Sequence, residues 1–369
     1  MDSTKIEWTD ATWNPITGCT LVSEGRRNCY AATLAATRLK HHPSREGLAR
    51  VNAAGEAKFT GEVRFNEGWL DQPCRWRKPR MIFVCAHGDL FHESVPDEWI
   101  DRVFAVMAQA GHHTFQVLTK RPERARDYIS TEAPDGTPTR FAHIFAEGAR
   151  AGIWKSDGGS FEWPLPNVWL GTSVEDQATT ETRIPHLLAT PATVRFVSAE
   201  PLLGPVDMEN IKTGTGYLDA VGPFIDQVAC GMSEDPLAAT LLQAGVEAGN
   251  ALAPLLPRLD WIILGGESGA RARPMHPDWA RSLRDQCQAA GVAFFFKQWG
   301  EWAPGECCDH SPTKSEHVAW WWNDDWSFDC LTPGAVEHMH RDDAPDLFRI
   351  GKRSAGRLLD GREWNEVPE

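Results

Sequence analysis

Two cysteines near the start of the chain are spaced as metal ligands often are. Cys19 and Cys29 flank a glycine-containing loop that leads into a run of helix-forming residues. In a chain that does not look secreted, closely spaced thiols bind metal more often than they form a structural disulfide. Tetrahedral zinc and iron–sulfur clusters need three or four ligands. The sequence therefore predicts a metal site to which Cys19 and Cys29 contribute two ligands.

Two segments around these cysteines resemble a known family. They are Ile6-Glu-Trp-Thr-Asp-Ala-Thr-Trp-Asn-Pro-Ile-Thr-Gly-Cys19 and Asn28-Cys-Tyr-Ala31, and they are similar to the opening of the phage- and prophage-encoded radical-SAM-like proteins. The resemblance runs from residue 6 to about residue 302 and resumes near the C-terminus. It implies a Cys-x6-Cys-x2-Cys loop that holds three irons of a 4Fe-4S cluster. The fourth iron in that family binds the amino and carboxylate groups of S-adenosylmethionine.

The chain departs from this motif at one position. Cys19 and Cys29 match the first and third cysteines of the loop, but Arg26 stands where the second belongs. An arginine guanidinium stays protonated and has no lone pair for a metal. None of the conceivable replacement ligands has ligand spacing relative to Cys19; they are Cys74, Cys85, Cys307, Cys308 and His310.

Polar or glycine residues follow each predicted strand and form a second set of candidates. The ends of parallel strands converge at one mouth in (β/α) barrels, where these groups suit a ligand with carboxylate, ribose hydroxyls and ammonium. The resemblance implies that Ala86–Asp89 receives the amino group of S-adenosylmethionine and that the glycines after the sixth strand contact adenine. A zinc site with His87, Asp89 and His92 is a weaker alternative. The predicted cofactor-binding residues are His87, Gly88, Asp89, Lys120, Ser173, Glu175, Glu200, Gly265, Gly266, Glu267 and Lys297.

Short apolar runs that alternate with helical patterns must position these residues. The runs predict parallel strands at residues 13–19, 81–86, 114–119, 167–174, 193–198, 260–264 and 292–296. The helical patterns are Tyr30–His41, which places Cys29 at a helix N-terminus, Pro96–Ala110, a short helix from Pro122, residues 177–189, and Pro277–Ala290. Pro185 must force a break or kink in the fourth of these helices.

This alternation predicts an α/β protein with a partial TIM-type (β/α) barrel, of the radical SAM kind if the resemblance holds. A doubly wound open sheet is the alternative fold, but no Gly-x-Gly-x-x-Gly follows the first strand. We expect residues 1–302 to form the barrel, with insertions at about 42–80, 131–166 and 205–258. Residues 303–369 are expected to form a C-terminal extension that packs on the barrel and contains a small β addition.

Composition limits the partners and the compartment. The chain has 37 Lys and Arg against 51 Asp and Glu, a net charge of −14, which argues against adhesion to nucleic acid over the whole surface. Three basic runs remain candidates for local phosphate binding: Arg75–Arg80, Lys120–Arg126 and Gly351–Arg357. No apolar run approaches the ~20 residues that span a bilayer. We expect a cytoplasmic protein without a membrane partner.

Two functions follow from these observations. The first is a radical SAM enzyme that uses an iron–sulfur cluster, S-adenosylmethionine and an external electron donor to form a 5′-deoxyadenosyl radical. Its substrate is then a modified nucleobase or nucleic acid of phage origin, as the family resemblance and the basic runs suggest. The second is a catalytically degenerate barrel that binds a nucleotide or nucleic acid, because Arg26 has ended cluster chemistry.

Overall fold

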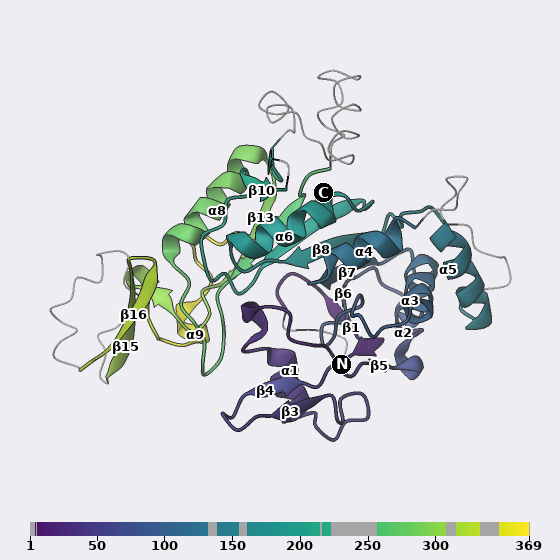
Figure 1. The fold of residues 1–369 in the computed structure, drawn as a ribbon, viewed down its shortest axis with the longest axis horizontal. Coiled ribbons are helices and arrows are strands. Elements are labelled where there is room, and N and C mark those ends of the chain that lie inside the picture. Colours follow the sequence, from purple (N-terminus) through teal and green to yellow (C-terminus); the bar gives the residue numbers. More distant parts are fainter. Residues whose placement is uncertain are drawn as a thin grey trace, which may run out of the picture. The chain divides into compact units, whose positions relative to one another are not determined.

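The chain forms two compact units, seen in the computed structural model in Figure 1. The structure describes residues 4, 6–131, 139–154, 161–214, 216–222, 257–307, 315–332 and 347–368. Unit 1 comprises Met1–Ser173 and Thr182–Val197, and unit 2 comprises Val174–Glu181 and Ser198–Glu369.

One seven-stranded sheet contains a strand at or next to every predicted position. Its order is β1-β6-β7-β8-β9-β12-β13. The order follows the order of the chain, as in a (β/α) barrel, whereas the strand order of a doubly wound sheet reverses part-way. The α/β class is therefore confirmed, with the strand order of a partial barrel. The strands are β1 (Ala11–Trp13), β6 (Met81–Val84), β7 (Thr114–Thr119), β8 (Val168–Ser173), β9 (Val194–Ala199), β12 (Trp261–Gly265) and β13 (Ala293–Gln298).

The pairings with a defined register are parallel: β1 with β6, β6 with β7, β7 with β8, and β12 with β13. These strands are rich in buried apolar residues, as parallel strands covered on both faces are. Among the largest fully buried side chains are Trp13, Phe115 and Phe196 in unit 1 and Trp261, Phe294 and Phe296 in unit 2.

The bounds of the first predicted strand, residues 13–19, are wrong. The sheet strand β1 ends at Trp13, and β2 (Ile16–Thr17) pairs antiparallel with β5 (Arg64–Phe65) in a separate two-stranded sheet. Pro15 has no N–H to donate and restricts the backbone of Asn14 before it. The strand is therefore interrupted between β1 and β2.

The segment after the cysteine loop packs onto it within unit 1. Helix α1 (Tyr30–Ala36) is shorter than predicted and contacts β3 (Ala49–Val51) and β4 (Ala57–Phe59), as Figure 1 shows. Lys58 Nζ donates to the Arg27 carbonyl oxygen at 3.0 Å. The segment continues through η2 (Glu67–Trp69) and α2 (Gln72–Arg75) to the start of β6.

Three further helices of unit 1 are joined by a buried polar network. Helix α3 (Asp97–Gln109) buries Ile100, Val103, Phe104 and Met107, as predicted. Helices α4 (Pro122–Ile129) and α5 (Thr139–Arg150) follow it in the chain. The Tyr128 hydroxyl on α4 donates to Asp101 on α3 at 2.7 Å, and Arg140 on α5 donates to the same carboxylate at 3.3 Å.

Gly171 on β8 packs directly against the Phe196 ring on β9. A Cβ at Gly171 would lie 2.6 Å from three ring atoms. Gly171→Ala is therefore expected to destabilise the protein by about 1–3 kcal/mol, measured by urea unfolding, because the ring has to move. Gly68→Ala is the matched control, since a Cβ there meets nothing within 4 Å. Equal losses for the two variants would contradict this packing.

Helix α6 (Gln177–Leu188) belongs to both units. It continues through Pro185 to Leu188, so of the predicted break or kink, the break does not occur. In unit 2, α8 (Pro277–Ala290) ends at Gly291 in the left-handed conformation (φ 66°), as predicted. It buries Trp279, Leu283 and Cys287.

The remaining elements of unit 2 are short. A small antiparallel sheet forms the predicted β addition after residue 302; its order is β14 (Ala303–Pro304), β17 (Leu347–Phe348), β15 (Glu316–Trp322) and β16 (Asp325–Leu331). The insertion at 205–258 contains the hairpin β10 (Ile211–Thr213) and β11 (Gly216–Leu218), and its residues 223–256 lie outside the described part. In the described ranges, no helix has the length and apolar character to cross a membrane.

Candidate functional site

The two candidate metal ligands flank a loop in unit 1. Cys19 follows β2 and is fully buried, whereas Cys29 immediately precedes α1 and is partly exposed. Both are free thiols. The position of Cys29 at a helix N-terminus confirms the prediction. Between them, the backbone of Arg26 lies in the short helix η1 (Glu24–Arg26), and its side chain is outside what the structure describes.

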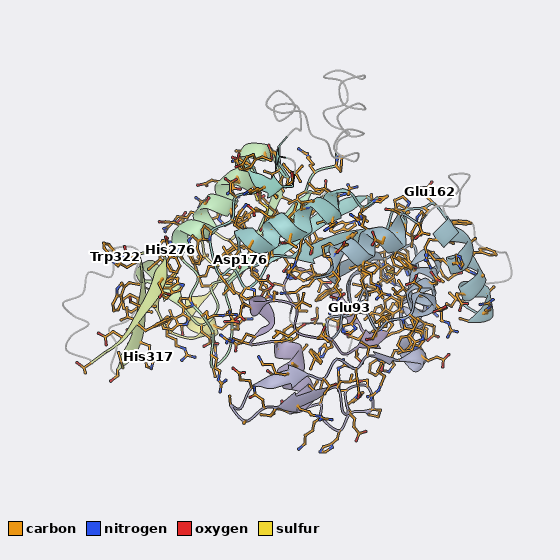
Figure 2. The ribbon with its side chains drawn as sticks, viewed as in Figure 1. Glu93, Glu162, Asp176, His276, His317 and Trp322 are labelled. Atoms are coloured by element: carbon orange, nitrogen blue, oxygen red, sulfur yellow. The ribbon has the colours of Figure 1, made fainter. Side chains whose placement is uncertain are left out.

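Arg121 brings a buried positive charge to Cys19. Its Nη1 lies 3.8 Å from Cys19 Sγ and 3.1 Å from Asp89 Oδ2. Its Nη2 donates to Thr20 Oγ1 at 2.5 Å, and its Nε donates to Glu93, labelled in Figure 2, at 2.6 Å. Burial lowers the pKa of Arg121, but the hydrogen bond to Glu93 and the charge of Asp89 outweigh burial, so the pKa is raised. The guanidinium therefore stays charged beside the thiol.

Asp89 is a fully buried carboxylate with four donors around it. Its Oδ1 accepts from the Phe91 amide at 3.1 Å and the Thr119 hydroxyl at 2.7 Å. Its Oδ2 accepts from the Lys120 amide at 3.2 Å and from Arg121 Nη1 at 3.1 Å. Because all four donors are protein groups, Asp89 ties the end of β7 to the turn after β6 and neutralises Arg121.

The turn after β6 packs against the strand before the cysteine loop. The Gly18 amide donates to the His87 carbonyl at 3.2 Å. A Cβ at Gly88 would lie 2.9 Å from the Ile16 carbonyl oxygen. Close packing of protein backbone therefore explains the glycine at position 88.

His87 is a partly buried histidine that stays neutral near pH 7. Arg45 Nε donates to its Nδ1 at 3.3 Å, and burial, with the Arg45 charge as the second cause, lowers the pKa of His87 from 6.5 to about 4. Between these two pH values the unfolded chain takes up a proton that the folded chain excludes. The contribution of His87 to the free energy of unfolding is therefore fully present above pH 6.5. It falls by about 3 kcal/mol as the pH drops towards 4.

The matched measurement is urea unfolding of the protein and of His87→Gln near neutral pH and near the folded pKa of about 4. The variant is expected to lose much less stability on acidification. Other histidines with lowered pKa contribute equally to both proteins, so the difference isolates His87. His112→Gln, at an exposed histidine, is the control. An unchanged pH dependence in His87→Gln would contradict the lowered pKa of this partly buried histidine.

In unit 2, Lys297 and Glu200 form an ion pair at the ends of β13 and β9. Lys297 Nζ donates to both carboxylate oxygens, at 2.6 and 2.8 Å. Gln298 Nε2 donates to Ser268 Oγ at 3.0 Å and lies 3.4 Å from Glu200 Oε1. The buried Oε1 of Gln298 has no hydrogen-bond partner within the described ranges. An ammonium, a carboxylate and the amide nitrogen of Gln298 therefore meet here.

The glycine segment after β12 is held by protein contacts. A Cβ at Gly266 would overlap the Trp299 carbonyl oxygen, so packing requires glycine there. Arg273 Nη2 and Nε donate to Glu267 at 2.7 and 2.9 Å. Gly265 is the last residue of β12, and its carbonyl accepts from the Leu202 amide at 3.2 Å.

The two candidates near α6 make backbone contacts. The Ser173 carbonyl at the end of β8 accepts from Arg183 Nη1 at 2.7 Å. The Glu175 amide donates to Thr179 Oγ1 at 2.9 Å, and its carbonyl accepts from the Leu203 amide at 2.7 Å. These bonds fix the backbone at the start of α6.

The predicted residues fall into one group per unit. In unit 1, Lys120 Nζ lies 3.4 Å from Ser23 Oγ on the cysteine loop, and Arg121 joins Cys19 to Asp89. Sequence reasoning missed Arg121 and Gln298, although each directly follows a predicted residue. The unit 1 group is Cys19, Cys29, His87, Gly88, Asp89, Lys120 and Ser173, and the unit 2 group is Glu175, Glu200, Gly265, Gly266, Glu267 and Lys297.

The described residues offer no alternative metal centre. Among them, no group of three or more His, Cys, Asp or Glu side chains is arranged to hold a metal ion, and this includes the proposed His87, Asp89 and His92 set. Burial raises the pKa of Cys85 to about 12, which keeps it a thiol at neutral pH. Cys308 and His310 lie outside the described residues.

Fold and site together define an α/β protein with barrel-ordered parallel strands and polar groups at their carboxyl ends. The chain belongs to the family described as "Protein of unknown function (DUF5131)", whose profile matches residues 3–368. Searches of curated proteins and of solved structures gave no match.

Proposed function

We propose that the protein is a radical-SAM-like barrel that binds a nucleotide or nucleic acid and has lost cluster-dependent chemistry. The radical-SAM-like ancestry is supported by the motif segments around Cys19 and Cys29 and by the strand order of the sheet. The observation that supports the loss of cluster chemistry is the set of metal donors in the loop, which has two thiols, Cys19 and Cys29, and an arginine where the second cysteine of the motif belongs.

The residues of the loop do not fit a 4Fe-4S cluster. In this family, three cysteine thiolates coordinate three irons of the cluster. The loop of this chain supplies only two of them, Cys19 and Cys29. Arg26 cannot donate an electron pair to iron. Cys19 is moreover turned towards the charged guanidinium of Arg121 at 3.8 Å.

Each unit, taken by itself, carries polar groups that suit a charged or hydroxylated ligand. In unit 1, Lys120 contributes a buried ammonium beside the Ser23 hydroxyl. In unit 2, Glu200 can accept hydrogen bonds from ribose hydroxyls, and the unpaired Oε1 of Gln298 can accept one more. Neither role needs iron. A cytoplasmic location is part of this proposal, because all the described cysteines are free.

The second candidate is the radical SAM enzyme. The observation that favours it is the retention of two free thiols, Cys19 and Cys29, at the two outer positions of the loop. Iron–sulfur chemistry then needs a third ligand from outside the loop and an external electron donor. A modified nucleobase or nucleic acid of phage origin is the substrate class that goes with this candidate.

Anaerobic reconstitution separates the two candidates. The protein is treated with iron and sulfide, its iron content is counted, and the binding of ATP and of S-adenosylmethionine is measured by calorimetry. The binding-protein proposal expects nucleotide binding of equal strength with and without iron. Stoichiometric iron together with cleavage of S-adenosylmethionine on reduction would overturn it in favour of the enzyme.

A further inference from the structure

An exposed run of cations precedes β6 in unit 1. Residues 75–80 contain four Lys or Arg side chains and no acidic residue, in a chain of net charge −14. Arg77 and Lys78 are exposed, and neither makes an ion pair with any residue that the structure describes. The run lies at the amino ends of the strands, so it is separate from the candidate site at their carboxyl ends.

Two described acids that contact residues of the run or next to it are already engaged. Asp71 pairs with Arg75 at 3.1 Å, where both side chains are about 60% exposed. Asp10 accepts from the Met81 amide at 2.8 Å. An exposed pair such as Arg75 with Asp71 contributes little free energy and yields readily to a stronger anion. The positive charges of Arg77 and Lys78 therefore face solvent.

The run is held against the sheet by aromatic and backbone contacts. The Arg80 guanidinium lies over the Trp76 ring, 4.8 Å from its centroid. The Trp76 carbonyl contacts His112 Nε2 at 2.8 Å, and the Arg80 carbonyl accepts from the Thr114 amide at 2.9 Å. A fixed backbone lowers the entropy lost when the side chains bind a partner.

We propose that residues 75–80 bind the phosphodiester backbone of a nucleic acid, independently of base sequence. Lys and Arg side chains neutralise phosphates and release counterions, which makes such binding steeply dependent on salt. Arg77 and Lys78 are the phosphate contacts. The choice of partner rests on the proposed function, but the surface is distinct from the cysteine loop and needs no iron.

The test is fluorescence anisotropy of a labelled single strand of about 20 nucleotides, which exceeds the site size of common single-strand-binding folds. The full chain is compared with the double variant Arg77→Glu/Lys78→Glu at several salt concentrations between about 50 and 200 mM. The variant is expected to bind at least about tenfold more weakly at the lowest salt. Its salt slope is expected to fall by about 1.4, for two lost contacts at about 0.7 each.

The matched control is Arg38→Glu/Lys40→Glu, which makes the same change of charge at two exposed cations after α1. This control should keep affinity within about threefold of the parent, since it removes no contact. Equal losses in the two double variants, or binding of the parent to anionic vesicles as tight as to the oligonucleotide, would overturn the proposal. Iron loading and cleavage of S-adenosylmethionine would overturn the binding-protein function and leave this result unchanged.

Discussion

Arg26→Cys is expected to raise the iron bound after anaerobic reconstitution from well below one cluster per chain to nearly one. The substitution restores a third thiolate between Cys19 and Cys29, and it removes a cation that repels iron. Iron and sulfide counting and the visible absorbance of thiolate-bound clusters measure the change. The free thiols Cys19 and Cys29 are already present to provide the other two ligands.

Arg27→Cys is the matched control for this experiment. It exchanges a neighbouring exposed arginine for the same thiol, one residue away from the motif position. It should leave iron binding low, because cluster ligation depends on ligand spacing. If Arg26→Cys remains colourless, the loop is degenerate beyond one residue. Full iron occupancy in the unaltered chain would contradict the conclusion that the loop cannot hold a cluster. It would show that a third ligand comes from outside the loop.

Asp89→Ala is expected to destabilise the protein by about 3–5 kcal/mol in urea unfolding, since it leaves the buried Arg121 guanidinium without its fully buried counter-charge. The carboxylate also satisfies the amide of Lys120 and the hydroxyl of Thr119. Glu93→Gln is the control at the same arginine, because the Glu93 side chain is 65% exposed. It should cost no more than about 1 kcal/mol.

A double variant distinguishes charge burial from simple packing. Asp89→Ala combined with Arg121→Met removes both charges, so it should be less destabilised than Asp89→Ala alone. If the double variant is as unstable as the sum of the two single variants, the charges are not coupled. If Asp89→Ala lowers the free energy of unfolding by less than about 1 kcal/mol, the hydrogen bonds and ion pair of Asp89 do not stabilise the protein as proposed.

The sheet was predictable because each strand is a short apolar run that is followed in the sequence by polar or glycine residues. Thr114–Thr119 was predicted at its observed bounds for this reason. The first strand was misplaced because its hydrophobic pattern continues past Pro15. Its pairing with the seven-stranded sheet ends before that proline. Pro185 was predicted to break or kink its helix, and α6 runs through it without a break.

The candidate site was only partly predictable. Spacing identified Cys19, but its contact with Arg121 joins residues 102 positions apart and leaves no local signal. The glycines at 88 and 266 illustrate a second limit. A sequence shows that something approaches the backbone closely, but it cannot tell whether the neighbour is a ligand or, as here, the carbonyls of Ile16 and Trp299.

The division of the chain into units has a consequence for its synthesis and its evolution. The chain passes between the units after Ser173, Glu181 and Val197, and the second passage falls inside α6. A nascent chain released at Ser173 still lacks part of unit 1, because Thr182–Val197 is made only after a piece of unit 2. Neither unit is a contiguous stretch of the gene, so one recombination event cannot transplant either alone. The family profile covers residues 3–368, so it spans both units.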